Sequence, residues 1–135
     1  MILLENSIMK LEYNPATDIL DVKYPDLFGY LLPEIRHSID TLLETVISYD
    51  VKKVLLDSRE TIVSIKPEES TDVSVYMASG LANTRLQKLA RLQSADTEVE
   101  GRAEENFHLI KKSLKLTYEL KIFSDKDKAM AWLTL

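Results

Sequence analysis

Asp57, Ser58 and Arg59 are the first residues that could carry chemistry, because they directly follow the short apolar run at 54–56. Such a run after an amphipathic helix is typical of a buried parallel strand, and open α/β sheets bind ligands beyond the carboxyl ends of such strands. These three residues are therefore a candidate switch or partner site, with Arg59 as the countercharge for a phosphate on Ser58. The simpler alternative is that Asp57 and Ser58 only satisfy backbone groups of the loop.

A second candidate surface is the segment 26–32, in which large apolar side chains fill the connection between a strand and a helix. Part of this segment must pack against the start of the helix. If the rest is exposed, Leu27, Phe28 and Tyr30 form an apolar contact for a partner or a ligand. The sequence leaves burial and contact open for these three residues.

Residues suited to metal or acid–base chemistry are sparse. The two histidines, His37 and His108, lack metal-ligand spacing, and the chain has no cysteine. The pairs Glu68-Glu69 and Glu104-Glu105 are expected in the first turns of helices, where the helix dipole accounts for them. No glycine-rich phosphate loop or nucleophile elbow is present. We therefore expect no catalytic residue, no metal site and no cofactor, in a protein that is not an enzyme.

Basic residues recur at every third position in Arg85, Lys88 and Arg91, and Arg59 is expected near the same end of the sheet. Together they could bind a small anion or an acidic partner. The simpler alternative is a solvated face beside an acidic loop.

Two periodicities of apolar residues in the sequence predict the strands and helices that must position these side chains. Alternating runs joined by a turn-rich loop predict an antiparallel hairpin, and apolar residues at helical spacing predict helices. Gly80 is expected to allow a close approach to the sheet or to bend its helix. In chain order we expect strands at 8–13 and 19–24, a helix at 33–49, a strand at 54–57, a helix from Pro67 to about Asn83, a strand at 86–92, a loop at 94–101, a helix at 102–115, a strand at 118–123 and a helix capped by Ser124. The order β-β-α-β-α-β-α-β-α predicts an α/β fold with a leading β-hairpin and otherwise parallel strands in a mixed sheet.

Composition favours one small domain over residues 1–135, because this length is typical of a single domain and no linker interrupts the chain. The absence of cysteine fits a reducing compartment, and neither a secretory signal nor an apolar run of membrane length is present. We therefore expect a cytoplasmic protein without an integral membrane segment. The net charge of −5 argues against nucleic-acid binding. The expected partner is another protein, and the exposed edge of the hairpin makes a homodimer a second possible assembly.

The order of elements resembles the SpoIIAA-like fold of the STAS domain superfamily, which includes anti-sigma factor antagonists and stand-alone STAS/SEC14-type proteins. The resemblance is carried by the hairpin, the helical stripe 35–47, the segment Lys53-Val54-Leu55-Leu56-Asp57-Ser58 and the tail from Tyr118 to Leu133. Phosphorylatable antagonists of this family carry Asp-Ser-Ser-Gly-Leu at the start of a helix. Here Asp57-Ser58-Arg59-Glu60 has no following glycine, so the resemblance does not extend to the phosphoserine switch.

Two functions follow from these residues and from the resemblance. The first is a non-enzymatic regulatory or protein-interaction module that docks a partner through the loops near Phe28 and Ser58. The alternative, implied by the SEC14 side of the resemblance and by the apolar segment, is a small apolar-ligand or lipid-binding protein. That alternative requires a cavity, and ligand pockets have volumes from roughly 300 Å³ upward.

Overall fold

A six-stranded sheet forms the centre of the structure, a computed structural model that describes all 135 residues. The strands of the sheet, in spatial order, are β1 (Ile2–Glu5), β2 (Lys10–Asn14), β3 (Ile19–Lys23), β5 (Lys53–Asp57), β7 (Lys88–Leu92) and β8 (Glu119–Phe123). The helices are α1 (Leu32–Ser48), α2 (Pro67–Ala82), α3 (Thr97–Ser113) and α4 (Lys126–Leu133), and the short 3-10 helix η1 (Gly29–Leu31) precedes α1. Two further strands, β4 (Leu27–Phe28) and β6 (Val63–Ser64), form a separate parallel pair.

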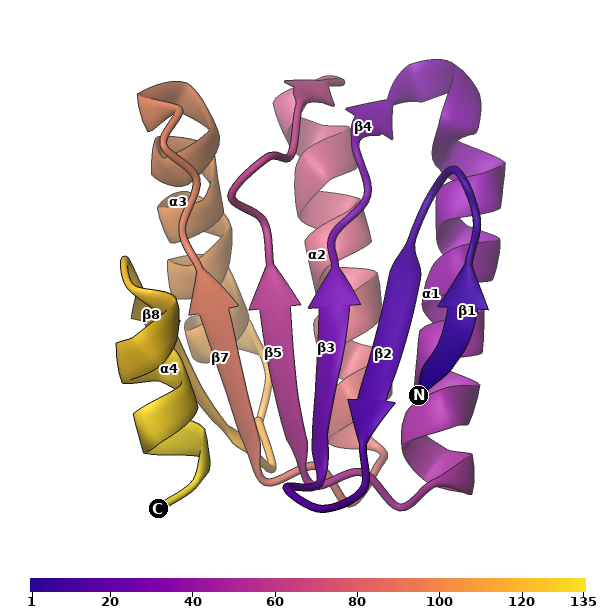
Figure 1. Cartoon of the computed structure of the whole chain (residues 1–135). Helices are drawn as coiled ribbons and strands as arrows, with labels where there is room; N and C mark the ends of the chain where they lie inside the picture. Colours follow the sequence, from indigo (N-terminus) through magenta and orange to yellow (C-terminus); the bar gives the residue numbers. More distant parts are fainter.

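Strand direction divides the sheet into two parts. β1, β2 and β3 are antiparallel, whereas β3, β5, β7 and β8 run parallel to one another. The helices α1, α2 and α3 connect the parallel strands in turn and lie on one face, and α4 crosses the other face (Figure 1). The predicted α/β class and the predicted order of elements from the hairpin to the last helix are confirmed.

The central strand β5 belongs to two hydrophobic clusters. Val54 and Leu56 are buried on the α1–α3 face, and Leu55 is buried on the α4 face. The unbroken apolar run of this strand thus reflects burial on both faces, as the sequence predicts.

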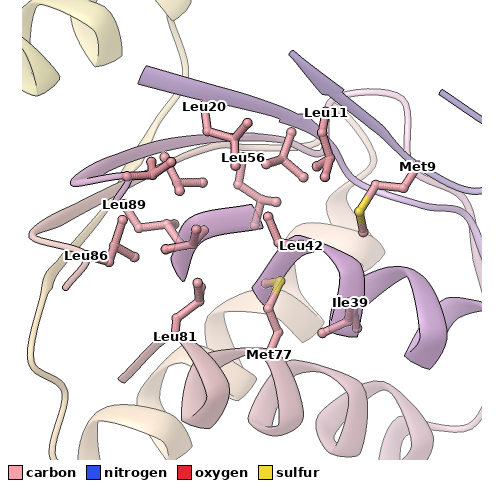
Figure 2. Close-up of a cluster of buried hydrophobic side chains, with 14 of the residues drawn as sticks. Met9, Leu11, Leu20, Ile39, Leu42, Leu56, Met77, Leu81, Leu86 and Leu89 are labelled. Carbon is pink, nitrogen blue, oxygen red and sulfur yellow. The ribbon is translucent and has the colours of Figure 1, made fainter. Parts of the chain in front are cut away.

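The helix α1 contributes a continuous apolar stripe to the larger cluster. Ile35, Ile39, Leu42 and Val46 are at most 1 % exposed, at the spacing that places them on one face of the helix. Figure 2 shows Leu42 of α1 and Met77 of α2 among the buried side chains that lie between these helices and the sheet. The predicted helix at 33–49 is confirmed within one residue at each end.

Gly80 lies where α2 approaches α1, not where α2 approaches the sheet. A Cβ atom at this position would overlap Leu43 of α1, with its Cδ2 atom at 2.9 Å and its Cδ1 atom closer still. The absence of a side chain therefore lets the two helices pack closely. The expected contact with the sheet is wrong, and the neighbour is the adjacent helix.

The helix α3 begins at Thr97, so the predicted loop at 94–101 is wrong in its second half. Asp96 caps the helix, because its Oδ1 atom accepts hydrogen bonds from the backbone N–H groups of Glu98 at 2.9 Å and Val99 at 3.3 Å. The acidic residues that suggested a solvated loop instead occupy the first turn, where the helix dipole favours them.

Three smaller features also differ from the prediction. The cap of α4 is Asp125 in place of Ser124, since the Asp125 carboxylate accepts the N–H of Asp127 at 3.0 Å. The strand β1 pairs with β2, so the outer edge of the predicted hairpin is covered and β1 forms the edge of the sheet. The pair β4–β6 was not predicted, because each strand has only two residues.

None of the helices combines the length and the apolar character needed to cross a membrane.

Candidate functional site

The loop after β5 carries the first candidate residues, and Asp57 and Arg59 pair with each other there. The Arg59 side chain donates two hydrogen bonds to the Asp57 carboxylate, from Nε at 3.0 Å and from Nη2 at 2.9 Å, and the Arg59 backbone N–H donates a third at 3.1 Å. The Arg59 guanidinium lowers the pKa of the Asp57 carboxyl, although partial burial opposes this shift. The pair fixes the start of the loop in one geometry.

Ser58 turns away from solvent and is 2 % exposed. Its hydroxyl donates a 2.7 Å hydrogen bond to the backbone oxygen of Leu92, at the end of the neighbouring strand β7. The contact ties the end of β5 to the end of β7. In this geometry the hydroxyl is directed at the protein interior, where a phosphate would lose this bond and need space that Leu92 occupies.

The apolar segment 26–32 is divided between the core and the surface. Leu27 is buried, Phe28 is half-buried and Tyr30 is 78 % exposed. The rings of Phe28 and Tyr30 stack at 5.9 Å between centroids with an interplanar angle of 17°. The structure thus assigns Leu27 to packing and leaves Phe28 and Tyr30 at the surface.

The two candidate regions lie side by side beyond the carboxyl ends of β3 and β5, at the upper edge of the sheet in Figure 1. The Leu27 N–H donates to the Ile62 oxygen at 2.8 Å, and the Ile62 N–H donates to Asp26 Oδ1 at 2.9 Å. Because Phe28 pairs with Ser64 and strand side chains alternate, Phe28 and Ile62 project from the same side of this small ribbon. Ile62 is 55 % exposed. We call Phe28, Tyr30 and Ile62 the carboxyl-edge surface.

An apolar pocket lies under the opposite side of the ribbon, between α2, α3 and the sheet. Its volume is about 100 Å³, and Leu27 and Val63 of the ribbon form part of its lining with apolar residues of both helices and of β5, β7 and β8. The pocket is therefore covered by the same ribbon that carries the carboxyl-edge surface.

Arg91 and Glu100 form an ion pair at this pocket that the sequence did not reveal. Nη1 of Arg91 lies 2.9 Å from Oε2 of Glu100, and Nη2 lies 2.8 Å from Oε1. Each side chain is 13 % exposed. Glu100 also accepts the backbone N–H of Ser94 at 2.6 Å, so both charges are paired within the fold.

The remaining basic residues do not join Arg91, and the predicted anion patch is not assembled. Arg85 pairs with Asp50 at 3.2 Å, near the amino ends of the parallel strands. Lys88 lies on the α4 face, where its Nζ donates to the Trp132 oxygen at 2.9 Å. Residues three apart in a strand point to opposite faces, which separates Lys88 from Arg91.

Asn106 joins α2 to α3 beside the pocket and was also missed by the sequence interpretation. Its Oδ1 accepts the Thr71 hydroxyl at 2.7 Å, and its Nδ2 lies 3.3 Å from the Ser70 hydroxyl and 3.4 Å from the Ser74 hydroxyl. A run of small hydroxyl residues on α2 facing a buried amide is the signal that could have indicated this contact. Every buried side-chain nitrogen and oxygen atom has a hydrogen-bond partner.

The histidines lie apart from this region. His37 of α1 and His108 of α3 are exposed, and no group of three or more histidine, aspartate or glutamate side chains converges as a metal site would require. No protein-family model, curated protein or solved structure matches the chain. The function must therefore be argued from the geometry of the carboxyl edge.

Proposed function

We propose that the chain is a cytoplasmic, non-enzymatic regulatory module that binds a protein partner through the carboxyl-edge surface. The observation that carries this proposal is the stack of Phe28 and Tyr30 at the surface, in which Tyr30 is 78 % exposed, together with the 55 % exposed Ile62 of the same ribbon region. In the order of its elements the chain resembles anti-sigma factor antagonists of the SpoIIAA-like STAS superfamily, and the same edge of the sheet carries the loops. Fold likeness alone is a weak argument for function, so the surface itself is what must be tested.

The composition of the carboxyl-edge surface supports protein recognition. Aromatic side chains are enriched where proteins bind one another, and a few such residues contribute most of the binding free energy. The pairing of β4 with β6 and the hydrogen bond between Asp26 and Ile62 hold these side chains on ordered backbone. A surface that is already ordered loses less conformational entropy when a partner binds.

Polar groups around the surface support binding in preference to catalysis. Asp57 is engaged by Arg59, and Ser58 donates its hydroxyl to Leu92. The proposal does not use a phosphoserine switch, because the Ser58 hydroxyl is turned inward. The exposed Arg59, held by Asp57, supplies a polar rim that can orient a partner.

Quantitative recovery of partners from the native cytosol tests the proposal. The full chain, the double variant Tyr30→Asp/Ile62→Asp and the control Ile47→Asp would be compared by mass spectrometry. Ile47 is exposed like Ile62 but lies on α1 near the opposite end of the sheet. We expect a partner that the wild type and the control retain and the double variant loses by roughly tenfold or more. Equal recovery of every protein by all three forms would exclude this surface.

A second function, binding of a small apolar ligand, would use the pocket between α2 and α3, whose volume is below the roughly 300 Å³ at which ligand pockets begin. Its volume of about 100 Å³ limits the ligand to a molecule no larger than benzene, because a protein cavity that binds benzene has a volume of roughly 150 Å³. An acyl chain would require a larger space or movement of the helices. Binding of a small ligand is tested by titrating the protein with benzene while the methyl resonances of Ile110 and Leu120 are monitored by NMR. The pocket-filling variant Ala103→Phe serves as the control, and unchanged resonances in the wild type would exclude this function.

A further inference from the structure

The last strand of the sheet, β8, has one edge without a partner strand. It pairs only with β7, in an unbroken parallel register from Glu119 to Phe123. The Glu119 N–H donates to Gln87 at 2.9 Å and the Phe123 oxygen accepts from Gln93 at 2.9 Å, so these two residues face β7. Because alternate residues of a strand direct their backbone groups to opposite sides, Leu120 and Ile122 present their N–H and C=O groups to the open edge.

The opposite edge of the sheet is less suited to pairing. β1 has four residues, and its register with β2 is interrupted between Ile2 and Leu4. Such irregularities bend a strand and discourage the addition of another. β8 has no bulge and no proline, so it is the edge that can accept a further strand.

A groove accompanies β8 on the side of α3. It has a volume of about 380 Å³ and lies between the strand and the last turn of the helix, where Leu114, Leu116 and Leu120 provide apolar contacts. Lys111 lines the same groove, with its Nζ 4.6 Å from the ring centroid of Phe107. An added strand would therefore place every second side chain against apolar residues on the α3 side.

The charge around β8 is positive, although the chain as a whole is acidic with a net charge of −5. Lys121 lies on the α4 side, with its Nζ 5.2 Å from the ring centroid of Trp132. Neither Lys121 nor Lys111 takes part in an ion pair, and the same holds for Lys112 and Lys115 at the end of α3. Glu119 is the single acidic residue of the strand. The surplus of unpaired lysines favours an acidic ligand.

We propose that β8 binds an extended acidic segment of a partner protein by strand addition. The backbone of Leu120 and Ile122 supplies the main-chain hydrogen bonds, as in other complexes in which a peptide extends a sheet. The segment alternates apolar residues, which contact Leu114 and Leu116, with acidic residues near Lys121. This site is separate from the carboxyl-edge surface and does not depend on it.

Amide NMR of the full chain tests the proposal with a synthetic probe. The probe is a blocked heptapeptide that alternates glutamate with isoleucine, and the amide resonances of Leu120 and Ile122 report on binding. We expect both amides to shift and to become protected from hydrogen exchange. A peptide with lysine in place of glutamate, and an acidic peptide with N-methyl groups on alternate residues, are expected to leave them unchanged.

Charge reversals in the protein provide the second arm of the test. Lys121→Glu, on the side of the acidic residues, should weaken binding of the acidic peptide roughly fivefold to tenfold at low ionic strength, and Lys111→Glu, on the α3 side, should weaken it about twofold. Lys10→Glu makes the same change on β2, remote from β8 in the order of the sheet, and should leave the affinity unchanged. All three lysines are at least partly exposed, but Lys10 pairs with Glu5 at 3.5 Å and with Glu12 at 3.7 Å, so the amide spectrum of each variant is first compared with that of the wild type to establish that it is folded.

Several outcomes would overturn the proposal. Unchanged Leu120 and Ile122 amides, or equal binding of the lysine peptide, would remove the acidic strand as the ligand. Protection of these amides that increases with protein concentration in the absence of peptide would assign the edge to a second copy of the chain.

Discussion

The two faces of the sheet differ in how completely helices cover them. On one face, which α1, α2 and α3 cover, α1 and α2 contribute to a cluster of 19 buried hydrophobic residues that extends from β2 to β7. On the other face α4 alone encloses a cluster of 6 residues over β3, β5 and β7. The rest of that face, on β2 and β3, carries charged residues that include Glu12, Asp21 and Lys23. The larger cluster must therefore supply most of the hydrophobic stabilisation of the fold.

The two faces also differ in whether their polar side chains are buried and paired within the fold or remain in contact with solvent. The larger face buries the Arg91–Glu100 pair and the amide of Asn106 and satisfies them internally. On the smaller face Lys88 and Lys121 keep contact with solvent and lie against the Trp132 ring at 5.1 and 5.2 Å. Elements with few buried contacts open locally at a lower free energy than the core does. We infer that α4 can detach while the rest of the fold persists.

The largest expected effect compares one leucine from each face. Leu42 in α1 and Leu133 in α4 are both fully buried, and each change to alanine leaves a cavity. Leu42→Ala should lower the free energy of unfolding by about 3–4 kcal/mol, whereas Leu133→Ala should lower it by about 2 kcal/mol because α4 can open separately. Denaturant titration measures both values.

Native-state hydrogen exchange shows whether the second loss is local. In Leu133→Ala the amides of α4 should exchange faster while those of α1 retain their protection. In Leu42→Ala the most protected amides of the whole sheet should exchange faster together. Equal acceleration across the chain in both variants would contradict the distinction between the faces.

The second prediction concerns the ion pair of the larger face. Glu100→Gln keeps an oxygen for the Ser94 N–H but leaves the charge of Arg91 without its partner on a mostly buried site. The free energy of unfolding should fall by about 2–3 kcal/mol. The double variant Arg91→Met/Glu100→Gln removes both charges and should regain at least about 1 kcal/mol of that loss. A double variant less stable than the single one would indicate that the pair acts by means other than charge compensation.

The parts of the fold that could be predicted are those in which one periodicity extends over several turns or a whole strand. The stripe of α1 from Ile35 to Val46 and the run of β5 are set by burial, and burial leaves a direct pattern in the sequence. The start of α3 could not be predicted in this way, because its first turn is acidic and resembles a solvated loop. Glu100 is mostly buried there because Arg91 of β7 pairs with its charge.

The candidate site was predicted in part for a related reason. The alternation of strands and helices predicts that Asp57 and Ser58 follow the central strand. It also predicts that Phe28 lies near them. The pairing of β4 with β6, which brings Ile62 next to this segment, involves two residues in each strand and has no periodicity to detect. The direction of the Ser58 hydroxyl depends on the position of Leu92 in space, which one sequence does not contain.

A smaller effect is expected at the contact between two helices of the larger face. Gly80→Ala must displace Leu43, whereas Gly101→Ala in α3 meets no atom within 4 Å. Gly101→Ala should raise the free energy of unfolding by about 0.5–1 kcal/mol, the ordinary gain of alanine over glycine in a helix. Gly80→Ala should lose that gain and lie at least about 1 kcal/mol below the Gly101 variant in thermal or denaturant unfolding. Equal stabilisation by both changes would mean that α1 and α2 are not in close contact.

A similarly small effect at neutral pH is expected for Tyr118, whose hydroxyl donates to the Ala78 oxygen at 3.2 Å on the larger face. Tyr118→Phe should lower the free energy of unfolding by about 1 kcal/mol at pH 7.

Burial raises the pKa of Tyr118 to about 12, whereas the unfolded chain releases this proton near pH 10. Between these values the folded state holds the proton more tightly, so the wild type should lose stability with rising pH relative to the variant, by up to about 1.4 kcal/mol per pH unit. Tyr13 and Tyr24, whose pKa values are also raised to about 12, are present in both proteins and cancel in the difference. Denaturant titrations from pH 9 to pH 11.5 should therefore give two curves that converge and cross. Parallel curves would mean that the folded protein ionises Tyr118 as easily as the unfolded chain does, which a closed helical layer on the larger face does not allow.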